Sequence, residues 1–248
     1  MTTSADRIDR QLGFVLHSRP YRETSALVDY FSSDYGVVRA VAKGVRSARS
    51  RQRHLTQPFQ LLELNWRGKS ELKTLLQGDL AGPGVLLQGR TLWCGMYLNE
   101  ITLRLLPQGD PQPKLFAYYQ LALQRLTDPQ QQEAVLRIYE RQLLQQLGLG
   151  VDFQRTQAGQ LIESKRWYWF DPQQGFEEVM DQSGYAGANI LAIEQDDYRQ
   201  ADVRRVAKRL MRQALAAHLG GRPLHSRELF LGTLGAADPR PAAEDGAR

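Results

Sequence analysis

Cysteine is nearly absent from this chain of 248 residues, which has Cys94 and no other. One thiol cannot close an internal disulfide bond, and it cannot furnish a cysteine-rich zinc site. The four histidines do not stand at metal-ligand spacing from one another or from Cys94. We therefore expect no disulfide framework and no bound metal, which is typical of a protein in a reducing cytoplasm.

Long apolar runs are also missing. The first ten residues, MTTSADRIDR, contain no segment that resembles a secretory signal. The most apolar stretch, residues 91–106, is interrupted by Asn99, Glu100 and Arg104. Because this stretch is too short and too polar to span a bilayer, it predicts a buried helix. We expect a cytoplasmic, nucleoid-associated protein that makes no contact with membranes.

The motifs of nucleotide-hydrolysing enzymes are absent too, since neither G-x-x-x-x-G-K-[ST] nor G-x-G-x-x-G occurs. Two pairs of adjacent carboxylates, Glu177-Glu178 and Asp196-Asp197, are candidates for metal-assisted hydrolysis. Adjacent carboxylates on turns and at helix starts are far more often solvated caps, and no nucleophile stands out. The sequence predicts a protein without catalytic residues or a cofactor, and not an enzyme.

Acidic residues are scarce in two regions. Residues 35–62 contain none, and residues 199–227 contain Asp202 alone against eight basic residues. The segment between them, residues 81–198, is acidic, with nine basic and fourteen acidic residues, although the whole chain has a net charge of +5. Two basic regions that flank an acidic middle favour a polyanionic partner. A basic surface that serves only solubility is the alternative.

The first part of the chain has the pattern of a small β-barrel. Five short strands separated by turns are predicted at residues 11–18, 24–31, 37–43, 59–66 and 71–76. Five strands with a longer break after the third are typical of a Greek-key barrel of the OB type. An SH3-like barrel is the structural alternative, because periodicity does not separate the two.

From residue 91 onward the apolar period becomes helical. Helices are predicted at residues 91–106, 114–126, 130–147 and 200–219, the third with Asp128 as its N-cap. Residues 150–188 are not helical, and the run from Trp167 to Phe170 predicts a hairpin with one aromatic face buried. We expect an α+β chain with an OB-fold domain at 1–82, a mainly helical domain with this insertion at 83–234, and a disordered tail at 235–248.

The segment from Arg39 to His54 is the strongest candidate for a nucleic-acid interface. Four arginines stand two to three residues apart in a loop that we expect to be mobile after Gly44, so that each can reach a separate phosphate. Trp66 lies beside two further cations and is the best candidate for stacking on bases, ahead of Tyr30 and Tyr35. The predicted nucleic-acid-binding residues are Arg39, Lys43, Arg46, Arg49, Arg51, Arg53, Trp66, Arg67 and Lys69.

A second basic surface is predicted on the helix at residues 200–219. Five cations lie along one side of this helix, opposite an apolar stripe, without an acidic partner among them. Either DNA or an acidic peptide would fit such a stripe, and a solvated helix face is the alternative. The residues are Arg204, Arg205, Lys208, Arg209 and Arg212.

Four segments in order carry a resemblance to a known family. They are Phe14-Val15-Leu16-His17-Ser18-Arg19-Pro20 with Glu23-Thr24-Ser25, then Val41-Ala42-Lys43-Gly44-Val45-Arg46-Ser47, then Tyr97-Leu98-Asn99-Glu100, and Leu219-Gly220-Gly221-Arg222-Pro223-Leu224-His225-Ser226-Arg227-Glu228-Leu229-Phe230. From about residue 10 to 232 the chain resembles the RecO family of bacterial recombination mediators.

The resemblance implies an N-terminal OB domain, a helical C-terminal domain and a role in the RecF pathway of DNA repair. It implies binding of single- and double-stranded DNA, annealing without ATP, and loading of RecA onto strands covered by single-strand-binding protein. The implied partners are RecR, the acidic tail of single-strand-binding protein and, indirectly, RecA. Many relatives carry a four-cysteine zinc site in the region of 150–188, but this chain has no cysteine there.

Two other functions fit the residues. An OB-fold accessory protein for RNA would share the basic barrel and would bind RNA at least as well as DNA. A scaffold for acidic protein tails would use the second basic surface and would not depend on the cations of the loop.

Overall fold

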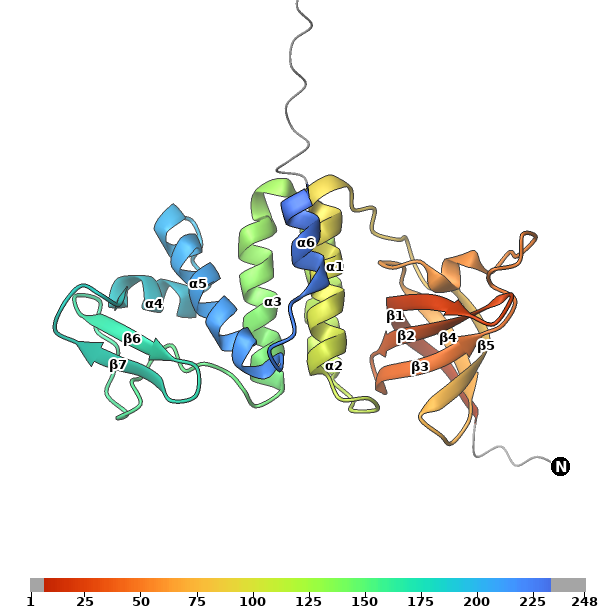
Figure 1. The fold of residues 1–248 in the computed structure, drawn as a ribbon, viewed down its shortest axis with the longest axis horizontal. Helices are drawn as coiled ribbons and strands as arrows, with labels where there is room; N and C mark the ends of the chain where they lie inside the picture. Colours follow the sequence, from red (N-terminus) through yellow and green to blue (C-terminus); the bar gives the residue numbers. More distant parts are fainter. Residues whose placement is uncertain (1–6, 233–248) are drawn as a thin grey trace, which may run out of the picture.

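The structure, a computed structural model, describes residues 7–232. Three parts follow one another along the molecule: a β-barrel, a layer of helices, and a small sheet that packs with two further helices (Figure 1). Within the described range no helix is both long enough and apolar enough to cross a membrane. The tail predicted at 235–248 lies outside the described residues.

The barrel closes in the order β1-β2-β3-β5-β4, with β4 paired back onto β1. Its neighbouring strands are antiparallel except β3 and β5, which are parallel. This is the Greek-key order of an OB-type barrel, so the predicted fold class is confirmed. The strands are β1 (Arg7–Tyr21), β2 (Ser25–Ser32), β3 (Gly36–Ala42), β4 (Leu62–Arg67) and β5 (Leu72–Leu80), and the 3-10 helix η2 (Arg53–Thr56) precedes β4.

Strand β1 contributes side chains to two hydrophobic cores. Val15 belongs to the core inside the barrel, whereas Phe14 and Leu16 belong to the core of the helical layer. The ring of Phe14 meets Tyr119 edge-on, at 5.2 Å between centroids. A β-bulge between Val15 and His17 interrupts the pairing of β1 with β2 at this point. The barrel and the helices are therefore joined through packed side chains.

A buried asparagine on α1 (Gly89–Leu105) fixes this junction. The Asn99 side-chain amide donates hydrogen bonds to the carbonyl oxygens of Val15 (3.3 Å) and Leu16 (3.0 Å) at the bulge. Its own oxygen accepts a hydrogen bond from the Tyr119 hydroxyl at 2.5 Å. Asn99 thus donates to two backbone carbonyls at the bulge and ties α1 to β1.

The helical layer matches the helices predicted from the 3.6-residue period. Asp128 accepts a hydrogen bond from the backbone N–H of Gln130, which confirms its capping role, although a short 3-10 turn precedes the third helix. The layer contains α1, α2 (Pro113–Arg125), η3 (Pro129–Gln131), α3 (Gln132–Gln146) and α6 (His225–Gly232).

The helix α6, which the periodicity did not predict, begins on a carboxylate of α1. Glu100 accepts hydrogen bonds from the backbone N–H groups of His225 (3.0 Å) and Ser226 (2.8 Å) and from the Ser226 hydroxyl (2.7 Å). Burial opposes ionisation of this carboxyl, but the bonds from Ser226 and His225 outweigh it and lower the pKa of Glu100. A residue 125 positions earlier in the chain therefore supplies the N-terminal cap of α6.

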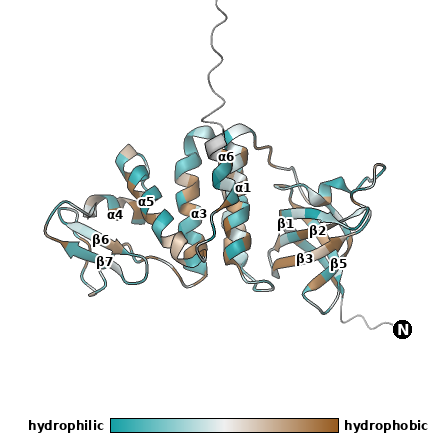
Figure 2. Cartoon of the chain, viewed as in Figure 1, coloured by the Kyte–Doolittle hydropathy of each residue, from teal (hydrophilic) through white to brown (hydrophobic). Residues whose placement is uncertain are grey.

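The small sheet has the strand order β7-β6-β8 and shares a core with α4 and α5. Tyr168 and Phe170 point into this core and Trp169 is exposed, so the prediction of a hairpin with one buried aromatic face is confirmed. Figure 2 shows hydrophilic and hydrophobic residues alternating along the helices, as expected of helices with one buried side. The elements are β6 (Trp167–Asp171), β7 (Gly175–Val179), β8 (Tyr185–Ala186), α4 (Gly187–Glu194) and α5 (Ala201–His218).

Candidate nucleic-acid interface

The segment between β3 and β4 covers one end of the barrel. Val45 and Leu55 in this segment are buried in the barrel core. Backbone hydrogen bonds from Ser47 to Gly44 (3.2 Å) and from Ser50 to Ser47 (3.0 Å) form successive turns before η2. Two apolar anchors therefore hold this segment against the strands, and the mobility expected for the residues between them stays a prediction.

Leu55 is the deeper of the two anchors. Its carbonyl oxygen accepts a hydrogen bond from the buried hydroxyl of Tyr30 at 2.8 Å. Its side chain lies over Gly78 of β5, where an added Cβ would stand 2.5 Å from the Leu55 Cδ2 atom. The backbone can approach this closely only because residue 78 has no side chain. Tyr30 is 0% exposed, so its ring cannot stack on bases, and burial raises the pKa of its hydroxyl far above its ordinary value.

Three of the predicted cations are engaged within the protein. The guanidinium Nε of Arg39 donates to Asp29 Oδ1 at 2.6 Å in a partly buried ion pair. Arg46 donates to the backbone carbonyls of Arg22 (3.2 Å) and Glu23 (3.3 Å), and Arg53 donates to the carbonyl of Ala48 (2.8 Å). Bonds to neutral carbonyls leave the positive charges of these two arginines uncompensated, but they fix where those charges stand.

Four other predicted cations are exposed and lack such partners. The side chains of Lys43, Arg49, Arg51 and Arg67 form no hydrogen bond or ion pair with any residue in the range 7–232. Lys69, in the turn between β4 and β5, is exposed but does not belong to this group, because it has an interaction within the protein. Since uncompensated cations on one surface repel one another, this end of the barrel is the most favourable place for an anion among the predicted residues.

Trp66 was wrongly predicted to stack on bases. Its side chain is 1% exposed inside the barrel, where it meets the ring of Tyr35 edge-on at 5.5 Å. The pattern of β4 accounts for this, because Leu62, Leu64 and Trp66 alternate on the inward face. Arg67, the last residue of β4, and Lys69, in the turn that follows, are exposed and do not share the inward face with Trp66.

A cavity of about 220 Å³ opens between the covering segment and the ends of β3, β4 and β5. It brings together Lys43 and Arg67, which are 24 positions apart in the chain, and adds Gln52 and Thr74, which sequence reasoning missed. Parallel pairing of β3 with β5 places Thr74 opposite Val41, and antiparallel pairing of β4 with β5 places it opposite Arg67. These four residues come together only through the strand order of the barrel, so the sequence alone does not show that they share a cavity.

The second predicted basic surface lies on α5, on the other side of the helical layer from the barrel (Figure 1). Arg204 donates to Tyr198 and Arg199 carbonyls and pairs with Glu133, and Arg205 pairs with Asp202. The Arg209 guanidinium stands 5.3 Å from the centre of the Tyr185 ring. Lys208 and Arg212 are exposed, with side chains that contact no polar partner within the described range. The two basic surfaces therefore do not form one continuous patch.

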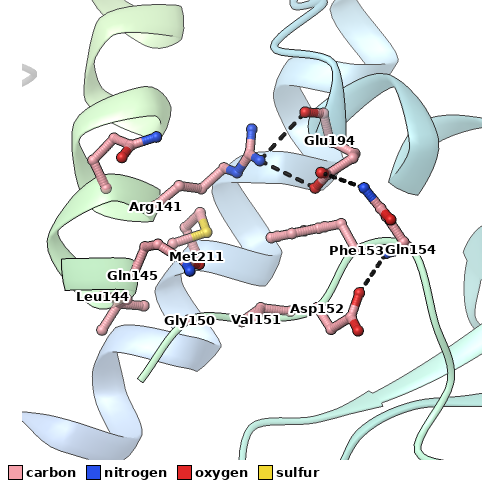
Figure 3. A pocket seen from close by; sticks show the side chains of 11 residues that line it. Arg141, Leu144, Gln145, Gly150, Val151, Asp152, Phe153, Gln154, Glu194 and Met211 are labelled. Atoms are coloured by element: carbon pink, nitrogen blue, oxygen red, sulfur yellow. Dashed lines mark hydrogen bonds and ion pairs between the residues drawn. The ribbon is translucent and has the colours of Figure 1, made fainter. Parts of the chain in front are cut away.

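A larger cavity, of about 490 Å³, lies between α3, α5 and the segment at 150–154. Its one cation, Arg141, points toward Glu194 and lies against Phe153, 5.0 Å from the ring centre (Figure 3). Arg141 also pairs with Asp196 and donates to the Ile193 carbonyl. Because these groups satisfy its charge and its donors, Arg141 ties α3 to the end of α4 and leaves no free cation in this cavity.

The residues at 150–188 do not fit a zinc site. Phe153, Ile162 and Phe176 of this region belong to an apolar core, and the region contains no cysteine. In the described part of the chain, no three or more His, Cys, Asp or Glu residues gather closely enough to hold a metal ion. Arginines engage both acidic pairs: Glu178 pairs with Arg166, Asp196 pairs with Arg141, and bonds from Arg199 lower the pKa of Asp197 to about 2.

Comparison with known proteins identifies the family. The family models "Recombination protein O N terminal" and "Recombination protein O C terminal" match residues 8–83 and 86–228. Proteins named "DNA repair protein RecO" from Stutzerimonas stutzeri and Pseudomonas aeruginosa PAO1 are 48% and 47% identical over 223 residues, which is 89% of this chain and 93% and 94% of theirs. One from Burkholderia pseudomallei is 40% identical over 234 residues, 92% of this chain and 85% of its own. The chain belongs to the RecO family.

Proposed function

We propose that this protein is a non-enzymatic recombination mediator in DNA repair that binds single- and double-stranded DNA through the covered end of its barrel. The observation that carries this proposal is the group of uncompensated, exposed cations there: Lys43, Arg49, Arg51 and Arg67. The phosphates of DNA supply the missing negative charges and release their counterions on binding. The names of the relatives, which are DNA repair proteins, support the same function.

Annealing without ATP follows from the same charges. Two complementary strands repel each other through their phosphates, and a surface with several free cations lowers this repulsion when both strands are bound. No bond is made or broken by the protein in this step. We further propose that the protein acts with RecR to load RecA onto DNA covered by single-strand-binding protein.

The salt dependence of binding tests the barrel interface. A variant with Lys43, Arg49, Arg51 and Arg67 changed to alanine should bind single-stranded DNA with a slope of log affinity against log salt that is shallower by about 0.7 per lost contact, roughly 3 in all. The slope is measured by fluorescence anisotropy with a labelled oligonucleotide over a range of salt concentrations. Annealing of complementary strands should slow in parallel.

A matched control removes the same total charge elsewhere. Arg90, Lys114, Arg125 and Lys165 are also exposed, and their replacement by alanine should leave the slope near that of the unmodified protein. Thermal melting of both variants checks the fold. If the two variants bind DNA alike, long-range charge alone accounts for the affinity and the barrel interface is rejected.

We propose that the basic surface of α5 binds the acidic tail of single-strand-binding protein. The exposed Lys208 and Arg212 carry this part of the proposal, because they are available without breaking an internal ion pair. Changing both residues to glutamate should weaken binding of a fluorescent aspartate-rich peptide by about tenfold or more, since repulsion replaces attraction at two exposed sites. Affinity for naked DNA should change less than twofold. A parallel loss of both affinities would contradict separate roles for the two surfaces.

A further inference from the structure

We infer that the cavity of about 220 Å³ at the end of the barrel seats one unstacked nucleotide of a single DNA strand. This inference rests on the proposed function and names the ligand of the same surface. Pockets for drug-sized ligands measure about 300–1,000 Å³. The smaller space here admits one base with its sugar and phosphate at the mouth, and not a stacked pair of bases.

The floor of the cavity suits the face of a base. Ala42, Val45, Leu55 and Leu75 form its buried base, each at most 7% exposed, and Leu76, which is 39% exposed, supplies the accessible apolar surface. Such a floor offers apolar contact without an aromatic ring, which agrees with the burial of Trp66 inside the barrel. An inorganic anion alone would gain nothing from this floor, because burial of a charge against apolar groups is unfavourable.

The rim of the cavity carries two polar side chains that are not hydrogen-bonded to other described residues. Neither the side-chain amide of Gln52 nor the hydroxyl of Thr74 forms a hydrogen bond within residues 7–232. These groups offer donors and acceptors to the edge of a base. Lys43 and Arg67 stand on the same rim with uncompensated charges and would hold the adjoining phosphates. The cavity therefore has an apolar surface for the face of a base, polar side chains for its edge, and cations at the opening for the phosphates.

The cavity distinguishes single strands from duplexes. A base within a duplex is stacked and paired, and moving it into a pocket costs a few kcal/mol, whereas a base in a single strand is already accessible. Duplex DNA would therefore meet the cations of the surface but leave the cavity empty. The contribution of Gln52 and Thr74 should appear in single-strand binding alone.

The test separates base contacts from phosphate contacts. The protein is titrated with a labelled oligothymidylate and with an oligonucleotide of equal length in which every nucleotide is abasic, so that the charges are equal. The unmodified protein should bind the base-bearing strand about tenfold more tightly, the effect of two ordinary hydrogen bonds and the apolar floor. The uncharged double variant Gln52→Ala with Thr74→Val should lose most of this preference, and keep its salt slope and its affinity for duplex DNA.

The outcomes are distinct. Equal affinity of the unmodified protein for the two strands, or full preference in the double variant, would overturn the nucleotide site and leave the proposed DNA binding intact. Absence of salt-dependent binding to either strand would instead reject the proposed function. As a further check, thymidine monophosphate should compete for the site better than inorganic phosphate at equal concentration. Equal competition would show an anion site only and would also overturn the inference. Melting curves of the double variant confirm that it is folded.

Discussion

Replacement of Asn99 by leucine is expected to lower the free energy of unfolding by about 3–5 kcal/mol. The leucine has nearly the same size but can neither donate to the carbonyls of Val15 and Leu16 nor accept from the Tyr119 hydroxyl. Three buried polar groups would lose a partner in a region without water access, which is the costly case for a hydrogen bond. Urea unfolding followed by fluorescence and by circular dichroism measures the loss.

The variant Tyr119→Phe is the matched control for this change. It removes only the hydroxyl that bonds to Asn99 and keeps the ring packed against Phe14 and Phe31. We expect it to cost about 1–2 kcal/mol, less than Asn99→Leu, because only one buried acceptor, the Asn99 oxygen, loses its partner. Similar losses for the two variants would show that the bonds from Asn99 to the bulge of β1 contribute little.

Replacement of Arg141 by leucine should cost about 3 kcal/mol. The side chain of Arg141 is 15% exposed, and it bonds to Glu194, to Asp196 and to the carbonyl of Ile193. The variant would leave two carboxylates side by side with no cation between them. A lysine at this position should recover part of the loss, because it restores the charge but not the planar fork of donors.

The control for Arg141 is Arg199, which pairs with Asp197 but has a side chain that is 89% exposed. Its replacement by leucine should change the stability by less than about 0.5 kcal/mol, as is usual for exposed ion pairs. Thermal melting at low and high salt compares the two positions. If Arg199→Leu is as destabilising as Arg141→Leu, the bonds of Arg141 to Glu194, Asp196 and the Ile193 carbonyl do not explain its role.

The regular elements could be predicted because their signals are local. Short runs of apolar and β-forming residues between turns predicted the five strands, with period-two alternation at residues 37–43, and Asp128 with Pro129 marked the start of the third helical segment. The helix α6 was missed for the opposite reason. Its N-terminal cap is Glu100, on a distant helix, and no pattern within residues 225–232 contains that information.

The candidate site could be predicted only in part. Sequence reasoning located the basic segment, but it could not tell Arg46 and Arg53, which bond to backbone carbonyls, from Arg49 and Arg51, which do not. Trp66 was misassigned because its neighbours in sequence were given more weight than the alternation of its strand. Gln52 and Thr74 carry no signal of their own, since they meet at one cavity only after the barrel has closed.

The sharing of β1 between two cores has a consequence for synthesis of the protein on the ribosome. Phe14, Leu16, Phe31 and Val37 pack against the helical layer, on the side of the strands that faces away from the interior of the barrel. About forty residues separate the end of β5 from Tyr119, so at roughly 5–20 residues per second these side chains stay uncovered for about 2–8 s after the last barrel strand is made. The nascent barrel thus presents an apolar face to solvent until α1 and α2 have both been translated, and its last folding step follows their synthesis.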